Sequence, residues 1–166
     1  MTGVALVSMH GANINFSESK DWETIRNIVT NQKIYPYVSD DFSPAPENYQ
    51  PIQQEQAHYV LVRDGDELLG LWAFCEHTHI CWQVHTCLLP IAYGERARIA
   101  AREMAEWIWN NTYCLRVITE IPEYNRLALR FARQSGMIDF GFNHACYLKH
   151  GVLYGVYLLG MSRGTN

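Results

Sequence analysis

Three strand-like segments in immediate succession constrain the fold of this 166-residue chain more than any other feature. Residues 58–62 (HYVLV) and 67–75 (ELLGLWAFC) flank an Asp-Gly-Asp turn at 64–66, which is a strong hairpin signal. A third apolar segment, residues 80–89 (ICWQVHTCLL), follows the stretch EHTH at 76–79, which we interpret as a second turn. The pattern predicts three successive antiparallel strands.

The rest of the chain predicts helices and further strands around these three. Apolar spacing predicts a helix over 21–34, and four prolines make 35–56 mostly loop. After residue 90 we expect a helix over 93–111, a strand over 115–121, a helix over 125–137 that ends at Gly136, and two strands, 140–148 and 152–161. This order predicts an α/β fold built on one mixed sheet, in a single domain covering 1–166.

Charge and hydropathy exclude several classes of partner. The net charge is −4 and the pI is near 5.9, so no nucleic-acid partner is expected. No apolar run approaches the ~18 residues of a membrane span, and residues 3–14 lack the basic start of a signal peptide. Five cysteines lie mostly in strand-like segments, which predicts reduced thiols and a cytoplasmic location.

A run of soft ligands raises the question of a metal site. Six side chains fall on odd positions between 75 and 87, and a single strand would point them to one face: Cys75, His77, His79, Cys81, His85 and Cys87. A turn at 76–79 removes that alignment, and no C-x₂-C spacing occurs. We therefore expect no metal, and interpret these residues as buried thiols and hydrogen-bonded histidines.

The join HTCLLPIAYGERARIAARE (residues 85–103) is the most informative segment. A strand ends, Pro90 interrupts it, and a Gly-containing loop leads into a helix. The first amides of a helix are free and its dipole is positive there, which suits a pyrophosphate group. Arg96, Arg98 and Arg102 would add cationic contacts. A plain connection carrying solvated arginines is the alternative.

This join resembles the acetyl-CoA-binding motif of the GNAT superfamily of N-acetyltransferases. In that family a strand ending near proline is followed by an R-G-x-G-x-G/A loop and a long helix. Tyr93 and Gly94 stand at the R-G positions, whereas Arg96 and Arg98 replace two small residues. The resemblance implies that acetyl-CoA is the co-substrate and that these four residues surround its pyrophosphate.

The segment VITEIPEYNRLALRFARQSGM (residues 117–137) is similar to the family's next strand and helix. Asn125 and Gly136 have the family spacing of eleven, with Ala128 and Phe131 at its apolar positions. The resemblance implies that Asn125 contacts the pantetheine arm, and the residue can also cap the helix. It implies a GNAT-like domain with a mixed, mostly antiparallel sheet of six to seven strands and three to four helices. The chain resembles phage- and prophage-encoded members in particular.

The family chemistry is direct attack of an amine on the thioester, which needs a base, an oxyanion donor and an acid. His85 is our first candidate for the base and Glu120 the second, the alternatives being a hydrogen-bonded histidine and a surface carboxylate. The backbone amide of Leu88 matches the family's contact to the thioester or pantetheine. Many members place an acid tyrosine at the position of Ala132.

Two tyrosines are the candidates for the missing acid, and a cysteine offers a different route. Tyr124 and Tyr93 would supply the proton, unless each is simply a packing aromatic. Cys87 would act as nucleophile only if transfer ran through an acyl-enzyme.

The acceptor and the partners are less constrained by the sequence. The loop 35–56, with Asp40, Asp41 and Glu47, could close one side of an acceptor cleft and suit a cationic substrate; a solvated linker is the alternative. The acceptor would be a small-molecule or protein amine, and strand 152–161 could form a homodimer interface. Two functions stay open: an N-acyltransferase, or an inactive CoA-binding or structural protein, for example in phage assembly within the host cytoplasm.

Overall fold

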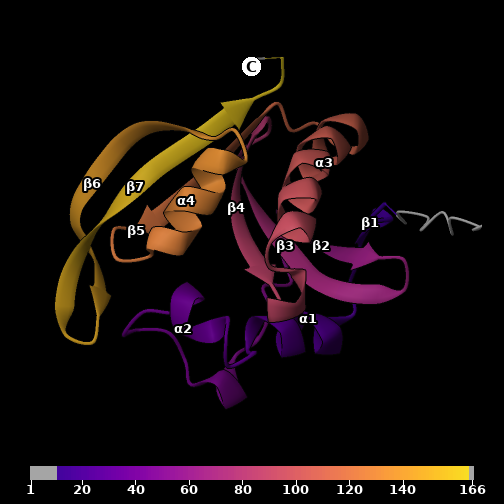
Figure 1. Cartoon of the computed structure of the whole chain (residues 1–166). Coiled ribbons are helices and arrows are strands. Elements are labelled where there is room, and N and C mark those ends of the chain that lie inside the picture. The colour runs from indigo at the N-terminus through magenta and orange to yellow at the C-terminus, as the bar shows by residue number, and fades with distance from the viewer. Residues whose placement is uncertain (1–10, 165–166) are drawn as a thin grey trace, which may run out of the picture.

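A computed structural model describes residues 11–164 and shows one seven-stranded sheet with the order β1-β2-β3-β4-β5-β7-β6 (Figure 1). Neighbouring strands are antiparallel except β4 and β5, which run parallel. The mixed, mostly antiparallel sheet predicted from the sequence is thus confirmed. The strands are β1 (Ile14–Glu18), β2 (Ala57–Asp64), β3 (Glu67–Thr78), β4 (Cys81–Leu88), β5 (Arg116–Pro122), β6 (Ile138–Lys149) and β7 (Val152–Ser162).

Helices cover both faces of the sheet (Figure 1). They are α1 (Trp22–Val29), α2 (Tyr35–Val38), α3 (Glu95–Asn111) and α4 (Arg126–Gln134), with 3₁₀ turns at Pro46–Asn48 and Pro90–Ala92. Val60 and Val62 of β2 pack with α3, whereas Tyr59 and Leu61 pack with α1. Because both faces of these central strands are buried, they read as continuous apolar runs in the sequence.

The local signals around α4 are confirmed. Asn125 caps the helix by accepting a hydrogen bond from the Ala128 amide at 3.2 Å. Gly136 follows the helix with φ of +96°, a left-handed conformation that other L-residues rarely adopt. These two residues fix where the helix begins and ends.

The second hairpin turn was misplaced by two to three residues. We predicted a turn over 76–79, but β3 continues to Thr78 and only residues 79–80 form the turn. A bulge between Glu76 and Thr78 absorbs the extra residue, and the Thr78 hydroxyl accepts a hydrogen bond from the Cys81 amide at 3.1 Å. A β-bulge has no clear sequence signature, so the pattern alone could not locate the turn.

The N-terminal third also differs from the prediction. The helix predicted over 21–34 ends at Val29, and α2 lies inside the segment predicted as loop. Ile34 and Tyr35 at its start are buried in the core beside α1, so this segment is no solvated linker. The edge strand β1 was not predicted, although Ile14 and Phe16 alternate toward the core as a strand requires.

Residues 11–164 contain neither a membrane-spanning helix nor a group of metal-binding side chains. No helix in residues 11–164 is both long and apolar enough to cross a membrane. Over the same range no three His, Cys, Asp or Glu side chains come together in a group that could bind a metal ion. Most of the segment considered as a signal peptide lies in residues 1–10, outside the described part.

Candidate active site

The candidate site lies where the parallel strands β4 and β5 separate. They pair only through Cys81–Gln83 of β4 and Arg116–Ile118 of β5. One residue further the Thr119 hydroxyl donates to the Val84 carbonyl at 3.1 Å, and beyond this point the strands diverge. β4 still runs to Leu88 and β5 to Pro122, so a gap opens between two well-ordered strands.

The backbone of β4 points hydrogen-bonding groups into this gap. The Leu89 amide donates to the Leu69 carbonyl at 2.8 Å, so residue 89 bonds toward β3. Successive residues of an antiparallel strand bond toward opposite edges, and the register with β3 is regular from Gly70 to Cys75. The amides of Thr86 and Leu88 therefore face the gap, where no strand of residues 11–164 pairs with them. An extended ligand could bond this edge as an added strand does.

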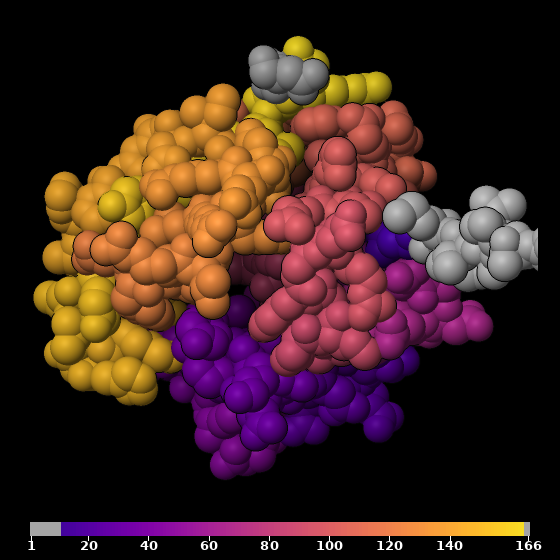
Figure 2. All heavy atoms as spheres, in the orientation of Figure 1, coloured from indigo at the N-terminus to yellow at the C-terminus, as the bar shows by residue number. Residues whose placement is uncertain are grey.

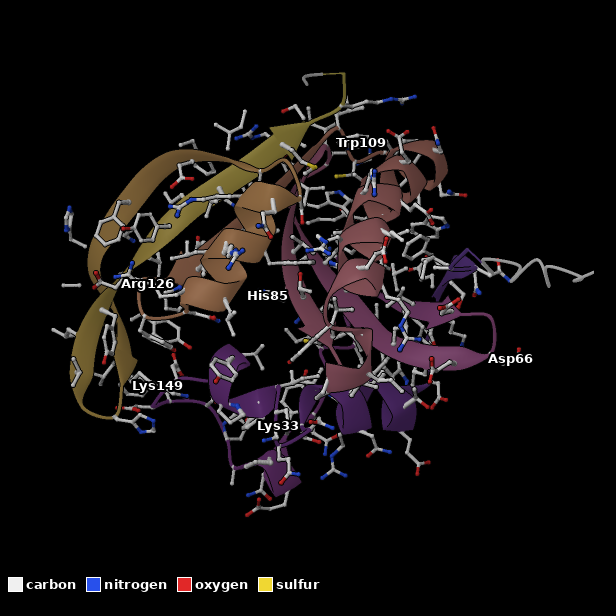
Figure 3. The ribbon with its side chains drawn as sticks, in the orientation of Figure 1. Lys33, Asp66, His85, Trp109, Arg126 and Lys149 are labelled. Carbon is white, nitrogen blue, oxygen red and sulfur yellow. The ribbon has the colours of Figure 1, made fainter. Side chains whose placement is uncertain are left out.

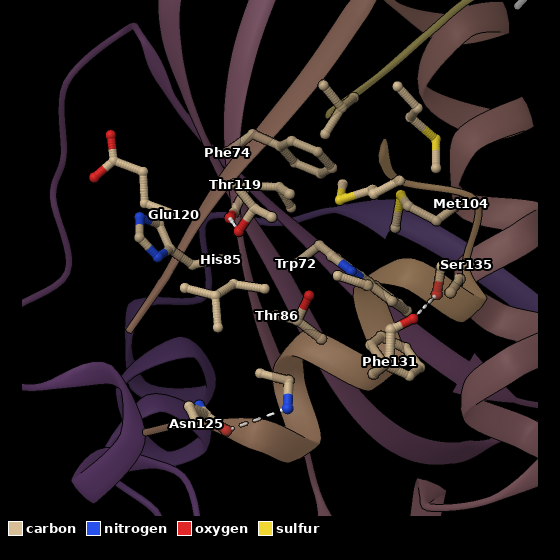
Figure 4. Close-up of a pocket in the computed structure, with 18 of the residues that line it drawn as sticks. Trp72, Phe74, His85, Thr86, Met104, Thr119, Glu120, Asn125, Phe131 and Ser135 are labelled. Atoms are coloured by element: carbon tan, nitrogen blue, oxygen red, sulfur yellow. Dashed lines mark hydrogen bonds between the residues drawn. The ribbon is translucent and has the colours of Figure 1, made fainter. Parts of the chain in front are cut away.

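A cavity of about 180 Å³ occupies the gap and reaches both faces of the sheet. Figure 2 shows the surface hollowed between α3 and α4, above the strands. In Figure 4, Trp72, Met104 and Phe131 lie on this side of the cavity. The opposite side is bordered by Tyr37, Val38, His85, Glu120 and Tyr147.

The structure brings His85 and Glu120 together. Figure 4 shows their side chains on the same side of the cavity, opposite Met104, and Figure 3 labels His85 on β4. The imidazole borders the cavity and is accessible to solvent there, but surrounding protein still displaces part of its hydration and lowers its pKa below 6.5. The Glu120 carboxylate acts in the opposite direction. His85 is thus a neutral imidazole near pH 7.

The start of α3 has the geometry expected of an anion site. Gly94 precedes the helix with φ of +95°. Because glycine has no side chain to cap the helix, the amides of the first turn can donate to a ligand. Tyr93 beside it is 59% exposed and makes no part of the core. The free amides and the helix dipole suit a phosphate group.

The two predicted phosphate-binding arginines are in different positions. Arg96 forms an ion pair with Glu67, approaches Asp64 at 3.6 Å, and donates to the Ile91 carbonyl. Its guanidinium therefore holds the β2–β3 hairpin against the loop before α3. Arg98 is exposed, and helical spacing puts it on the side of Ala105, which lines the cavity. Arg98 is the better-placed cation for a ligand in the groove.

Tyr147 borders the cavity and Tyr124 does not, a difference that the sequence did not predict. Tyr124 is absent from the cavity wall; its ring packs on Tyr154 at 4.7 Å, and its hydroxyl is buried without a well-formed hydrogen bond in the described residues. Tyr147, which the sequence analysis missed, borders the cavity beside it and donates to the Ser39 carbonyl at 2.8 Å. Burial raises the pKa of both phenols.

Cys87 is not placed for nucleophilic chemistry. Its side chain is 2% exposed and packs in the core beside α1. Burial raises the pKa of its thiol to about 12, so the reactive thiolate is not populated near neutral pH. The acyl-enzyme alternative therefore has no support at this position.

The loop after α1 closes one side of the cavity, but not through its carboxylates. Asp41 accepts hydrogen bonds from the amides of His150 and Gly151 at 2.7 and 2.8 Å, and Asp40 caps its own turn. Figure 3 shows Lys149, at the tip of the β6–β7 hairpin, close to this loop. The expectation that Asp41 faces a cationic acceptor is wrong, because its carboxylate holds the loop to the hairpin, and the Asp40 carboxylate is used within its own turn.

Together the sheet order, the gap and the helix that begins at Gly94 define a GNAT-like fold, the fold of a class of N-acetyltransferases. The chain matches spermidine N-acetyltransferase from Vibrio cholerae, solved with CoA and spermine, at a TM-score of 0.75 and 15% identity, covering 91% of this chain and 96% of that one. It matches ribosomal-protein-S5-alanine acetyltransferase from Vibrio fischeri at 0.71 and 16%, covering 95% and 97%. A putative phosphinothricin N-acetyltransferase matches at 0.69 and 14%, covering 92% and 99%.

At these identities the likeness establishes the fold and nothing finer. No protein-family model and no curated protein sequence matches the chain. The structural matches lend no support to the closer resemblance to phage proteins, which stays a prediction.

Proposed function

We propose that the protein is an acetyl-CoA-dependent N-acyltransferase that moves the acyl group directly to an amine. The observation that carries the proposal is the gap between β4 and β5, with the amides of Thr86 and Leu88 directed into it. This edge leads to Gly94 and the free first turn of α3. An extended pantetheine arm that ends in a phosphate group fits both features.

Several residues are positioned to hold the co-substrate. The first-turn amides of α3 and the Arg98 guanidinium would bind the pyrophosphate, with Tyr93 beside them. Asn125 borders the cavity, and its Oδ1 is used by the helix cap, so its Nδ2 is the group that would donate to the pantetheine. Arg96 would act indirectly, by holding the hairpin against the loop before α3.

His85 is the proposed base. Acetyl-CoA supplies a thioester, and the amine that attacks it must lose a proton. A neutral imidazole near pH 7 can accept that proton, and the neighbouring Glu120 carboxylate stabilises the imidazolium that results. The amide of Leu88 is the proposed donor to the developing oxyanion.

The absence of a tyrosine at Ala132 is compatible with this chemistry. A thiol has an ordinary pKa near 8.5, so a thiolate is a fair leaving group at neutral pH. Tyr124 and Tyr147 have raised pKa values, and transfer of a proton from either to a thiolate would be uphill. We therefore assign Tyr147 a hydrogen-bonding role at the cavity wall, with Tyr124 behind it, in place of the acid role expected for Tyr124.

The alternative function is an inactive CoA-binding or structural protein. Ala132 and the loss of two small residues to Arg96 and Arg98 favour it. The small-molecule or protein amine, the homodimer and the cytoplasmic location stay predictions of the sequence.

Calorimetric titration with acetyl-CoA, with free CoA as reference, tests the proposal. Saturable binding is expected, and at a hundredfold excess over the dissociation constant it stabilises the fold by about 2.7 kcal/mol. Release of free thiol in the presence of primary amines would then separate the enzyme from the binding protein. Absence of binding at millimolar ligand would refute the enzyme and the CoA-binding protein and leave the structural protein.

A further inference from the structure

The cavity extends past the gap into an apolar inner pocket between α3 and α4. Figure 4 shows Phe74 and Met104 on this side, away from His85 and Glu120. Phe74, Met104, Ile108 and Val117 are each at most 5% exposed. The inner pocket is lined by Phe74, Met104, Ile108, Val117, Met137 and Met161.

Two of the hydroxyls that line the cavity, those of Thr119 and Ser135, are already satisfied by the protein. Thr119 donates to the Val84 carbonyl at 3.1 Å, and Ser135 donates to the Phe131 carbonyl at 2.7 Å (Figure 4). Among residues 11–164 no ionisable side chain lines this end, since His85 and Glu120 lie on the other side of the gap. An apolar cavity of ~150 Å³ stays dry and takes a hydrocarbon such as benzene. The inner pocket thus favours a hydrocarbon over water.

Small side chains keep the inner pocket open. Ala132 on α4 and Ala105 on α3 both line the cavity. A bulky residue at either position would occupy part of the cavity, because both alanines line it. The absence of a large residue at Ala132 thus has a steric consequence besides its chemical one.

We propose that the preferred donor is an acyl-CoA whose acyl chain has about four to six carbons, longer than acetyl. This inference rests on the proposed function: a pantetheine arm that runs along β4 from Gly94 toward Val84 would direct the acyl chain into the inner pocket. The step is unchanged. The amine nitrogen bonds to the acyl carbon, the carbon–sulfur bond breaks with its electron pair going to sulfur, and His85 takes the amine proton. The acyl chain has only the inner part of the cavity of about 180 Å³, and this limits the chain length.

Calorimetric titration of the wild-type protein with free CoA and with acetyl-, butanoyl-, hexanoyl- and dodecanoyl-CoA tests the proposal. Each buried methylene can tighten binding up to about fourfold. We expect hexanoyl-CoA to bind at least tenfold more tightly than acetyl-CoA, and dodecanoyl-CoA to lose this gain. Equal or weaker binding of hexanoyl-CoA would overturn the inference alone. Failure of free CoA and of every thioester to bind would overturn the proposed function with it.

Two variants locate the effect. Ala132→Leu should abolish the preference for hexanoyl-CoA while free CoA still binds. Ala105→Leu, on the less buried α3 side, should have the same effect and serves as the test if Ala132→Leu unfolds. Gln134→Leu is the matched control, because Gln134 is exposed on α4 and absent from the cavity wall. An unchanged preference in a folded Ala132→Leu or Ala105→Leu protein would refute the inner pocket as the acyl site.

Discussion

Replacement of Gly70 by alanine is expected to damage both the sheet and the ligand-binding edge of β4. Gly70 lies on β3 opposite Leu88, with φ of +142°. A Cβ there would lie 2.2 Å from the Cys87 carbonyl oxygen and 2.8 Å from the Leu88 Cα. Both contacts are with backbone atoms, so β3 and β4 would have to separate.

The expected cost can be worked from these contacts. The backbone conformation costs an L-residue about 1–3 kcal/mol. Two weakened ladder hydrogen bonds between β3 and β4 add about 1 kcal/mol each. The variant should therefore lose about 3–5 kcal/mol in the free energy of unfolding, which corresponds to a fall in Tm of about 6–20 °C for a chain of this size.

Gly65→Ala is the matched control. Gly65 also has a positive φ, +58°, but a Cβ there has no atom within 4 Å. Only the conformational cost of about 1 kcal/mol remains, so Tm should fall by about 2–4 °C. Urea unfolding gives the two free energies, and acetyl-CoA titration should show weaker binding for Gly70→Ala only. Equal losses for the two variants would show that the β3–β4 contact is not the cause.

Three further predictions concern the site. His85→Gln should lower turnover by about 10²–10⁴ without weakening CoA binding, and wild-type activity should be lost only as the pH falls below the lowered pKa of His85. A His85→Gln protein whose turnover equals that of the wild type between pH 6 and 9 would remove His85 as the base. Arg98→Glu should weaken CoA binding in calorimetry more than Arg96→Glu, which should mainly loosen the hairpin; equal effects would contradict the separation of the two arginines. Asn125→Ala should lose about 1 kcal/mol in unfolding free energy and bind CoA more weakly. Asn125→Asp should keep the helix cap and lose only affinity for CoA. Full CoA affinity in the Asp variant would show that Nδ2 makes no contact.

Much of the fold could be predicted because its signals are local. The turn at 64–66, the Asn125 cap and the left-handed Gly136 act within a few residues, so a single segment contains the physical cause of each. The misplaced turn at 79–80 depended on a bulge, and α2 depended on burial of Tyr35 against distant residues. Neither cause is visible in a short window of sequence.

The candidate site was predicted in part. His85 and Glu120 were found because the strands on either side of the cofactor motifs were recognised, and both residues border the cavity. Tyr147 was missed because it lies on β6, far along the chain from the other site residues. Its hydroxyl is held by the Ser39 carbonyl, 108 residues earlier in the chain. No sequence pattern links two positions that far apart.

The sequence by itself determined the order of the elements, the glycine that starts α3 and the asparagine that starts α4, since each depends on the conformational preference of one residue. Tertiary structure alone decided which arginine is free and how deep the cavity extends. Arg96 is held by Glu67, 29 residues away, whereas Arg98 is exposed. Ion pairs and cavities depend on which faces of distant elements meet, and that is set when the sheet and helices pack together.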